Sequence, residues 1–176
     1  AVVDGHAIPD EPNLMFEQGR QHDVPFLIGA NADEGTFFLP PRLPVQPRGW
    51  RLALTRIFGR QVVDEVAPHY PTPQTAAEVR SVFAAMLGDA QFVAPAWSLA
   101  SQHAEKTPQT YFYFFSRVFP SPRAEQYGAS HGFEIPYVFG TLSRWAPAVD
   151  RTLSEGMRTA WVNFARDGSP TGPEPG

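Results

Sequence analysis

The sequence predicts an α/β protein with a mostly parallel sheet flanked by helices, and three observations carry that prediction. Residues 24–31, VPFLIGAN, form a short continuous apolar run ending at Gly29, which is typical of a buried parallel strand. Residues 110–118, TYFYFFSRV, are aromatic and resemble a second strand. The chain between these two runs is largely helical in pattern, and strands separated by long helical stretches are typical of α/β proteins.

The segment after the first strand is predicted to be a loop followed by two helices. In residues 32–47, Gly35 and four prolines interrupt any regular period, which predicts a loop. The apolar residues of Trp50–Phe58 recur at helical spacing, and Gln61–Val66 is predicted to form a second, shorter helix.

Three longer helices are predicted in the rest of the chain. Thr75–Leu87 has apolar residues three and four positions apart, and Gly88 is its natural stop. Phe92–Ala104 follows, with Pro95 tolerated in its first turn. Leu153–Ala165 is amphipathic, with an expected inward face of Met157, Ala160, Trp161 and Phe164.

The composition narrows the class of protein. The chain has 176 residues, 43% of them hydrophobic and 18% charged, which indicates a globular chain long enough for one domain with a core. A net charge of −4 without a basic run argues against a nucleic acid partner. No apolar stretch approaches the roughly 20 residues of a membrane span. The absence of cysteine excludes disulfides, thiolate metal sites and cysteine nucleophiles, and no motif indicates a metal site.

The number of predicted strands is small for a parallel sheet. A buried parallel strand needs neighbours on both sides, and two strands leave the run VPFLIG largely uncovered. We therefore expect the chain to be part of a larger domain. The predominance of arginine over lysine, together with 19 prolines, suggests a GC-rich bacterial source.

A short pattern near the C-terminal end raises the question of a nucleophile. Residues 127–140 read YGASHGFEIPYVFG, and residues 128–132 fit the G-x-S-x-G pattern of a nucleophile elbow. An elbow serine lies on a sharp turn between a strand and a helix, but no strand precedes Ser130 and no clear helix follows it. The adjacent His131 is also poorly placed to serve it, because neighbouring side chains generally point apart. The context therefore argues against Ser130 as a nucleophile.

The chain resembles the type-B carboxylesterase and cholinesterase family of α/β-hydrolases in five segments that follow the family's order. They are VVDGHAIPD, VPFLIGANADEGTFFLP, YFYFF, SHGFEIPYVFG and MRTAWVNFARDGSP. The resemblance covers nearly all of residues 1–176 and is weakest over residues 40–88. It implies the C-terminal portion of an α/β-hydrolase fold, which is incomplete without the N-terminal portion.

The resemblance also implies two members of a catalytic triad. It identifies Glu34, the acidic residue before the glycine of NADEG, as the triad acid, and His131 as the general base. On this fold the triad runs serine, acid, histidine along the chain, so the nucleophile is expected before residue 1. Asp33 is the alternative acid, because either carboxylate can orient an imidazole. His6, His22, His69 and His103 are expected to be structural or solvated.

The resemblance also suggests roles for other side chains near the triad, and each has a simpler structural alternative. The resemblance implies that Phe37 and Phe38 line an apolar substrate pocket suited to uncharged esters, although they could simply pack the loop. Glu134 could hold the histidine loop as a second carboxylate, or be a plain hydrogen-bond acceptor. Asp89 matches a family position that looks structural.

The implied activity is hydrolysis of carboxylic esters through an acyl-serine intermediate, with no cofactor and no metal. The expected partners are a small-molecule ester and the N-terminal portion of the same enzyme, which would supply the serine and the oxyanion hole. The isolated chain is expected to be inactive. Two alternatives remain: a fragment without function of its own, and a cholinesterase-like adhesion or scaffold protein. The fragment alternative is compatible with the esterase assignment, and a split enzyme completed by a separate N-terminal chain is a third option.

Overall fold

The computed structural model describes residues 3–40 and 42–172, which form two compact units. Unit 1 comprises residues up to 30, residues 93–115 and residues from 132 onward. Unit 2 comprises residues 31–92 and 116–131. The sheet belongs to unit 1, while Glu34 and His131 both belong to unit 2.

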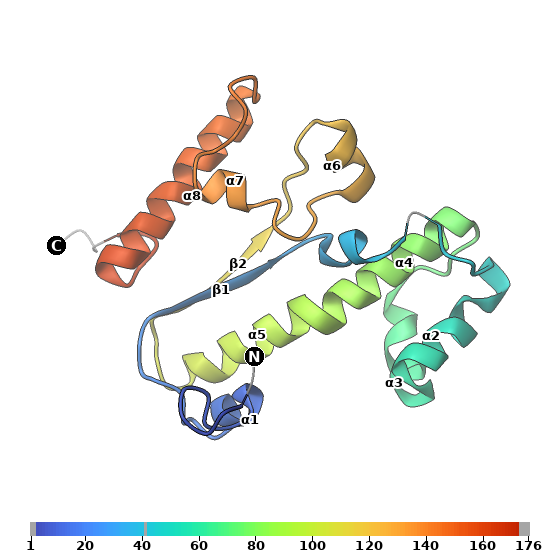
Figure 1. The fold of residues 1–176 in the computed structure, drawn as a ribbon, viewed down its shortest axis with the longest axis horizontal. Helices are drawn as coiled ribbons and strands as arrows, with labels where there is room; N and C mark the ends of the chain where they lie inside the picture. The colour runs from blue at the N-terminus through green and yellow to red at the C-terminus, as the bar shows by residue number, and fades with distance from the viewer. Residues whose placement is uncertain (1–2, 41, 173–176) are drawn as a thin grey trace. The chain divides into compact units, whose positions relative to one another are not determined.

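The sheet of unit 1 contains the two predicted strands. The strands β1 (Phe26–Asn31) and β2 (Thr110–Phe115) are hydrogen-bonded neighbours and run in the same direction (Figure 1). Gly29 permits their close approach, because a Cβ at this position would lie 2.3 Å from the carbonyl oxygen of Tyr113. The predicted α/β class, with helices around a parallel sheet, is confirmed.

Unit 1 also contains four helices: α1 (Pro12–Glu17), α5 (Ala94–Ala104), α7 (Ile135–Val138) and α8 (Ala148–Asp167). His103 of α5 is buried, and its Nδ1 lies 2.7 Å from Oγ1 of Thr110 on β2. Its ring also packs 4.9 Å from that of Phe26 on β1. His103 therefore joins α5 to both strands, which fits the expected structural role.

The helix α8 is longer than the predicted Leu153–Ala165 because polar residues anchor its first turns. Asp150 and Ser154 are buried. The Tyr137 hydroxyl donates to Asp150 Oδ1 at 2.6 Å, and Ser154 Oγ donates to the Tyr137 carbonyl at 2.8 Å. A search for apolar periodicity cannot find such turns, since their buried side chains are polar.

Unit 2 is helical. Its core is a cluster of buried apolar side chains that includes Trp50, Leu54, Val63, Val79 and Phe83. Its helices are the 3₁₀ turns η1 (Glu34–Phe38), η2 (Pro47–Gly49) and η3 (Ala67–His69), and the α-helices α2 (Trp50–Phe58), α3 (Arg60–Val66), α4 (Ala76–Gly88) and α6 (Pro122–Tyr127).

The prediction that Gly88 ends its helix is wrong. The chain continues from α4 through the π-helical turn η4 (Asp89–Val93) into α5. Gly88 is not among the glycines with a positive φ angle, and Asp89 after it keeps right-handed helical angles. The absence of a side chain at Gly88 serves close packing instead.

The helical run Ala76–Ala104 is the one described segment long and apolar enough, by length and composition, to cross a membrane. This run does not appear in the sequence as an unbroken apolar stretch, because charged residues such as Arg80 interrupt it. A core helix meets the same criterion, and Val79, Val82 and Phe83 of this run are buried in the core of unit 2.

The π-turn η4 is tied to the rest of unit 2 by a hydrogen bond from the Tyr70 hydroxyl to the Asp89 carboxylate. Burial of the hydroxyl and the bond to the neighbouring carboxylate raise the pKa of Tyr70 above its ordinary value. Asp89 thus has the structural role expected from the sequence.

We predict that Tyr70→Phe lowers the free energy of unfolding by about 1–2 kcal/mol at neutral pH, because the Asp89 carboxylate loses its donor. Since the pKa of Tyr70 is raised in the folded state, its stabilising contribution is complete below about pH 10 and is lost as the pH rises through the folded-state pKa. Urea unfolding at neutral pH and in alkali should therefore show a smaller difference in unfolding free energy between wild type and variant in alkali. An equal difference at both would contradict this account.

Candidate active site

The Glu34 carboxylate lies at the centre of a buried hydrogen-bond arrangement in unit 2. Its Oε2 is 2.7 Å from Nδ1 of His131, and its Oε1 accepts the backbone N–H of Asn31 at 2.7 Å. The side chain of Glu34 is only 6% exposed, whereas that of His131 is 49% exposed. The two side chains that the resemblance pairs as acid and base are thus in contact.

The Glu34 contact determines which nitrogen of His131 can act as a base. A carboxylate only accepts hydrogen bonds, so Nδ1 must carry a proton. In the neutral imidazole, Nε2 then bears the free lone pair. Within residues 3–40 and 42–172, Nε2 makes no hydrogen bond. The half-exposed imidazole is therefore ready to take a proton from an incoming group.

Asp33, the alternative acid, has a different partner. Its Oδ2 accepts the backbone N–H of Ala129 at 2.8 Å, and its own N–H donates to the Ala129 carbonyl at 3.0 Å. These two bonds connect the segment after β1 to the segment that precedes His131. The two carboxylates thus have different partners: Asp33 joins the two segments, and Glu34 contacts the imidazole.

Ser130 is buried and does not have the geometry of an elbow. Its Oγ lies 3.0 Å from Oγ1 of Thr36, and its carbonyl accepts from the Asn31 side-chain amide at 2.8 Å. No described residue other than glycine has a positive φ angle, so Ser130 is not held in a strained turn. These contacts agree with the argument from sequence context against Ser130 as a nucleophile.

A close approach between η1 and α4 fixes the backbone that carries Glu34. A Cβ at Gly35 would lie 2.0 Å from the Ala84 carbonyl oxygen and 2.8 Å from the Gly88 nitrogen. The Arg80 guanidinium on α4 also donates to the Thr36 carbonyl at 2.9 Å. The acid therefore lies on a turn pressed against a helix, and two glycines make that contact possible.

Aromatic rings pack against the His131 imidazole. The ring centroid of His131 is 5.4 Å from that of Phe38 and 4.9 Å from that of Phe92. Phe37 instead contacts Phe38 and Tyr127, at 5.8 and 6.1 Å. Phe37 and Phe38 are each about half exposed, so they present apolar surface beside the imidazole. Their role as a pocket wall stays a prediction.

Glu134 is the N-cap residue directly before the short helix α7 in unit 1. Its backbone carbonyl accepts from the N–H groups of Tyr137 and Val138, at 2.9 and 3.1 Å. The proposed role of its carboxylate in holding the histidine loop stays a prediction. Among the described residues, no group of three or more His, Cys, Asp or Glu side chains is arranged to hold a metal ion.

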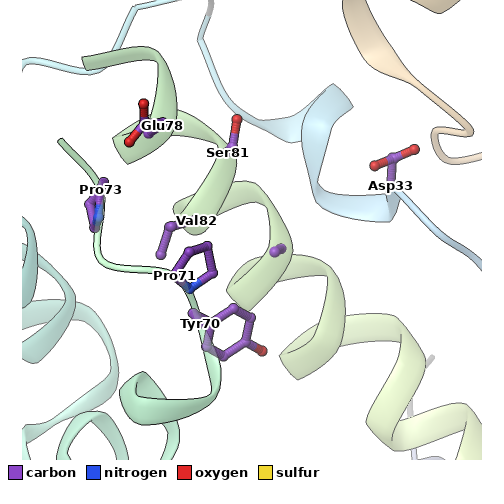
Figure 2. Close-up of a pocket in the computed structure, with 8 residues that line it drawn as sticks. Asp33, Tyr70, Pro71, Pro73, Glu78, Ser81 and Val82 are labelled. Atoms are coloured by element: carbon purple, nitrogen blue, oxygen red, sulfur yellow. The ribbon is translucent and has the colours of Figure 1, made fainter. Parts of the chain in front are cut away.

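A cavity of about 400 Å³ lies elsewhere in unit 2, and neither Glu34 nor His131 lines it. Figure 2 shows Tyr70, Pro71 and Val82 gathered on one side, with Asp33 apart from them, directly before η1. The candidate catalytic pair, with its buried carboxylate and half-exposed imidazole, therefore lies outside this cavity.

Three contributors to the site were not identified from the sequence. The sequence predicts only a helix for Phe92 and a helix stop for Gly88, and it indicates no role for Thr36. One signal was available: Ala84 and Gly88 are four residues apart, which places two small side chains on one helix face and permits close packing. No comparable local pattern marks Phe92 or Thr36, because their contacts are distant in sequence.

Comparison with known proteins places this geometry in a family context. The sequence profile described as the Carboxylesterase family matches residues 1–175. A solved structure of PNB esterase superposes with a TM-score of 0.70 at 27% identity, covering 96% of this chain and 34% of that one.

Curated relatives show the same pattern of partial coverage. Human neuroligin-2 is 30% identical, over 99% of this chain and 24% of its own length. Rat acylcarnitine hydrolase is 30% identical, over 97% and 34%. The fumonisin B1 esterase of Sphingopyxis macrogoltabida is 34% identical, over 96% and 32%. The chain thus spans between a quarter and about a third of the length of these relatives.

We predict that Gly35→Ala is destabilising by about 2 kcal/mol or more, because the new Cβ would collide with the Ala84 carbonyl and push η1 from α4. Urea unfolding measures this loss. The matched control is Gly156→Ala in α8, where an added Cβ meets no described atom within 4 Å and should stabilise the helix by up to about 1 kcal/mol. Equal effects of the two substitutions would contradict the close-packing account.

Proposed function

The chain belongs to the carboxylesterase family, and from that premise we propose that it is the part of a serine carboxylesterase that carries the triad acid, Glu34, and the general base, His131. The fold supports this proposal, because it is a partial α/β-hydrolase fold. The observation that carries it is the 2.7 Å contact between Glu34 Oε2 and His131 Nδ1. The two residues stand in the order, acid then histidine, that this fold uses.

The proposed reaction begins with attack by a serine outside residues 1–176. His131 Nε2 removes the proton from the serine hydroxyl as its oxygen bonds to the ester carbonyl carbon. The carbonyl π electrons move onto the oxygen, and the tetrahedral intermediate forms. When that intermediate collapses, the bond to the alkoxy group breaks and the imidazolium gives its proton to the departing alcohol.

The same imidazole then serves the second half of the reaction. His131 Nε2 removes a proton from water as the water oxygen attacks the acyl-serine carbonyl. Collapse of the second intermediate breaks the acyl–serine bond, returns the proton to the serine oxygen and releases the carboxylic acid. No redox change and no cofactor are required by these steps.

Glu34 acts in this scheme through His131. Its carboxylate holds the proton on Nδ1, so that Nε2 is the basic nitrogen, and it stabilises the imidazolium formed twice in each cycle. Burial strengthens that interaction, since a charge pair is less screened away from water. The bond from the Asn31 N–H satisfies the other carboxylate oxygen and keeps the side chain in place.

The serine and the oxyanion hole are proposed to come from the N-terminal portion of the same enzyme. The relatives support this, because the chain matches only 24 to 34% of the lengths of the three named above. Half-exposed Phe37 and Phe38 beside the imidazole favour uncharged, apolar esters as substrates. No nucleic acid and no membrane span are part of this proposal.

Family membership alone leaves one alternative open. Neuroligin-2 matches the chain as well as acylcarnitine hydrolase does, at 30% identity, and its name denotes no hydrolase. A non-enzymatic relative has no need of a buried carboxylate bonded to a half-exposed imidazole. The retained Glu34–His131 pair therefore favours the esterase over a binding or scaffold protein.

We expect Glu34→Gln in the intact enzyme to lower kcat by about 10³- to 10⁴-fold, because a neutral amide neither holds the tautomer nor stabilises the imidazolium. Asp33→Asn is the matched control: the amide oxygen can still accept from Ala129, so kcat should fall less than about tenfold. Hydrolysis of p-nitrophenyl butyrate measures both. A larger loss in Asp33→Asn than in Glu34→Gln would reverse the assignment of the acid.

We also expect the purified chain of residues 1–176 to release no p-nitrophenol from p-nitrophenyl butyrate, because it lacks the serine and the oxyanion donors. Ser130→Ala is the control variant. A burst of product from the chain that disappears in Ser130→Ala would overturn the proposal that the nucleophile lies elsewhere.

A further inference from the structure

Three aromatic rings of unit 2, those of Phe38, Phe92 and His131, contact one another. Phe38 and Phe92 are stacked, with an interplanar angle of 18° and centroids 5.4 Å apart. Each is also tilted against the His131 ring, by 57° and 47°. All three distances lie in the range in which aromatic pairs attract one another. The imidazole therefore packs against a two-ring platform.

The hydrogen bond to Glu34 does not by itself define the plane of the imidazole. A single contact at Nδ1 still permits coupled rotations about the χ1 and χ2 bonds of His131, whose side chain is 49% exposed. Any such rotation moves Nε2, which lies across the ring from Nδ1. Contacts with the ring face are what restrict this motion, and Phe92 makes the shorter of the two.

Phe92 comes from an unusual backbone element. It lies in the π-turn η4 (Asp89–Val93), between two α-helices, and π-turns in helices are frequently found at functional sites. The first residue of the turn, Asp89, accepts the hydrogen bond from the Tyr70 hydroxyl. The turn is thus anchored at one end and presents an aromatic ring near the other.

We propose that Phe92 is a positioning residue for the general base: held by the anchored π-turn, its ring fixes the plane of the His131 imidazole so that Nε2 faces the reacting groups. This inference rests on the proposed role of His131. It assigns Phe92 no contact with the reacting atoms. Phe38 shares the platform, but it is about half exposed and belongs to the predicted substrate pocket, so its loss would mix two effects.

The experiment compares Phe92→Leu with Phe83→Leu in the intact protein that contains this chain. Phe83 is buried in the core of unit 2 on the same helical run, and the described ring contacts of His131 do not include it. Phe92→Tyr tests rescue by a second aromatic ring, and Phe92→Met replaces Phe92→Leu should that variant fail to fold.

Two readouts separate this inference from the proposed function. The first is the NMR shift and line width of the His131 ring protons in histidine-labelled protein, assigned with His131→Gln, and it requires no activity. The second is the kinetics of p-nitrophenyl butyrate hydrolysis, with kcat and KM measured separately.

For Phe92→Leu we expect the ring-current shift of the His131 protons to fall, and kcat to fall about tenfold with KM within about twofold of wild type. Phe92→Tyr should restore both readouts, and Phe83→Leu should change neither. An unchanged His131 signal in Phe92→Leu, an equal effect of Phe83→Leu, or a rise in KM alone would overturn the proposal. If the intact wild-type protein shows no esterase activity but Phe92→Leu still reduces the ring-current shift of the His131 protons, the packing contact is upheld and the proposed function is refuted.

Discussion

The candidate site depends on one buried carboxylate. Glu34 accepts from the Asn31 backbone through one oxygen and from the His131 imidazole through the other, both at 2.7 Å. A buried carboxylate is costly unless both oxygens are satisfied, so the arrangement requires η1 to be held in one place. The contact of Gly35 with α4, where no Cβ would fit, provides that constraint. Local backbone packing in unit 2 thus determines the orientation of a side chain that would act in catalysis.

The serine next to His131 illustrates how a short motif can mislead. Ser130 matches a nucleophile pattern, but it is buried, and its carbonyl and hydroxyl contact Asn31 and Thr36. Together with the two bonds between Asp33 and Ala129, these contacts join the segment after β1 to the segment before His131. The residues around the histidine therefore bring acid and base together, and a hydroxyl that looks reactive in the sequence is part of the scaffold.

The sequence predicted the elements whose signal is local. The strands β1 and β2 and the helix α2 follow from apolar runs and periodicity, and the proposed acid and base follow from family motifs. Features that depend on distant contacts could not be predicted. Gly88 looks like a helix stop, because its use in packing against Gly35 involves residues 53 positions away in the chain. Likewise, Phe92 shows no sign in the sequence of facing His131, and the polar anchors Asp150 and Ser154 of α8 are invisible to hydrophobic periodicity.

The central claim is that this chain contributes the acid and the base, while the nucleophile lies elsewhere in the enzyme. Reaction of the intact protein with a fluorophosphonate, followed by mass spectrometric mapping of the modified residue, tests that claim most directly, because the reagent bonds to a serine activated by its histidine. The account predicts one adduct, on a serine outside residues 1–176, that forms far more slowly in His131→Gln. An adduct on Ser130, or labelling that is indifferent to His131, would contradict it.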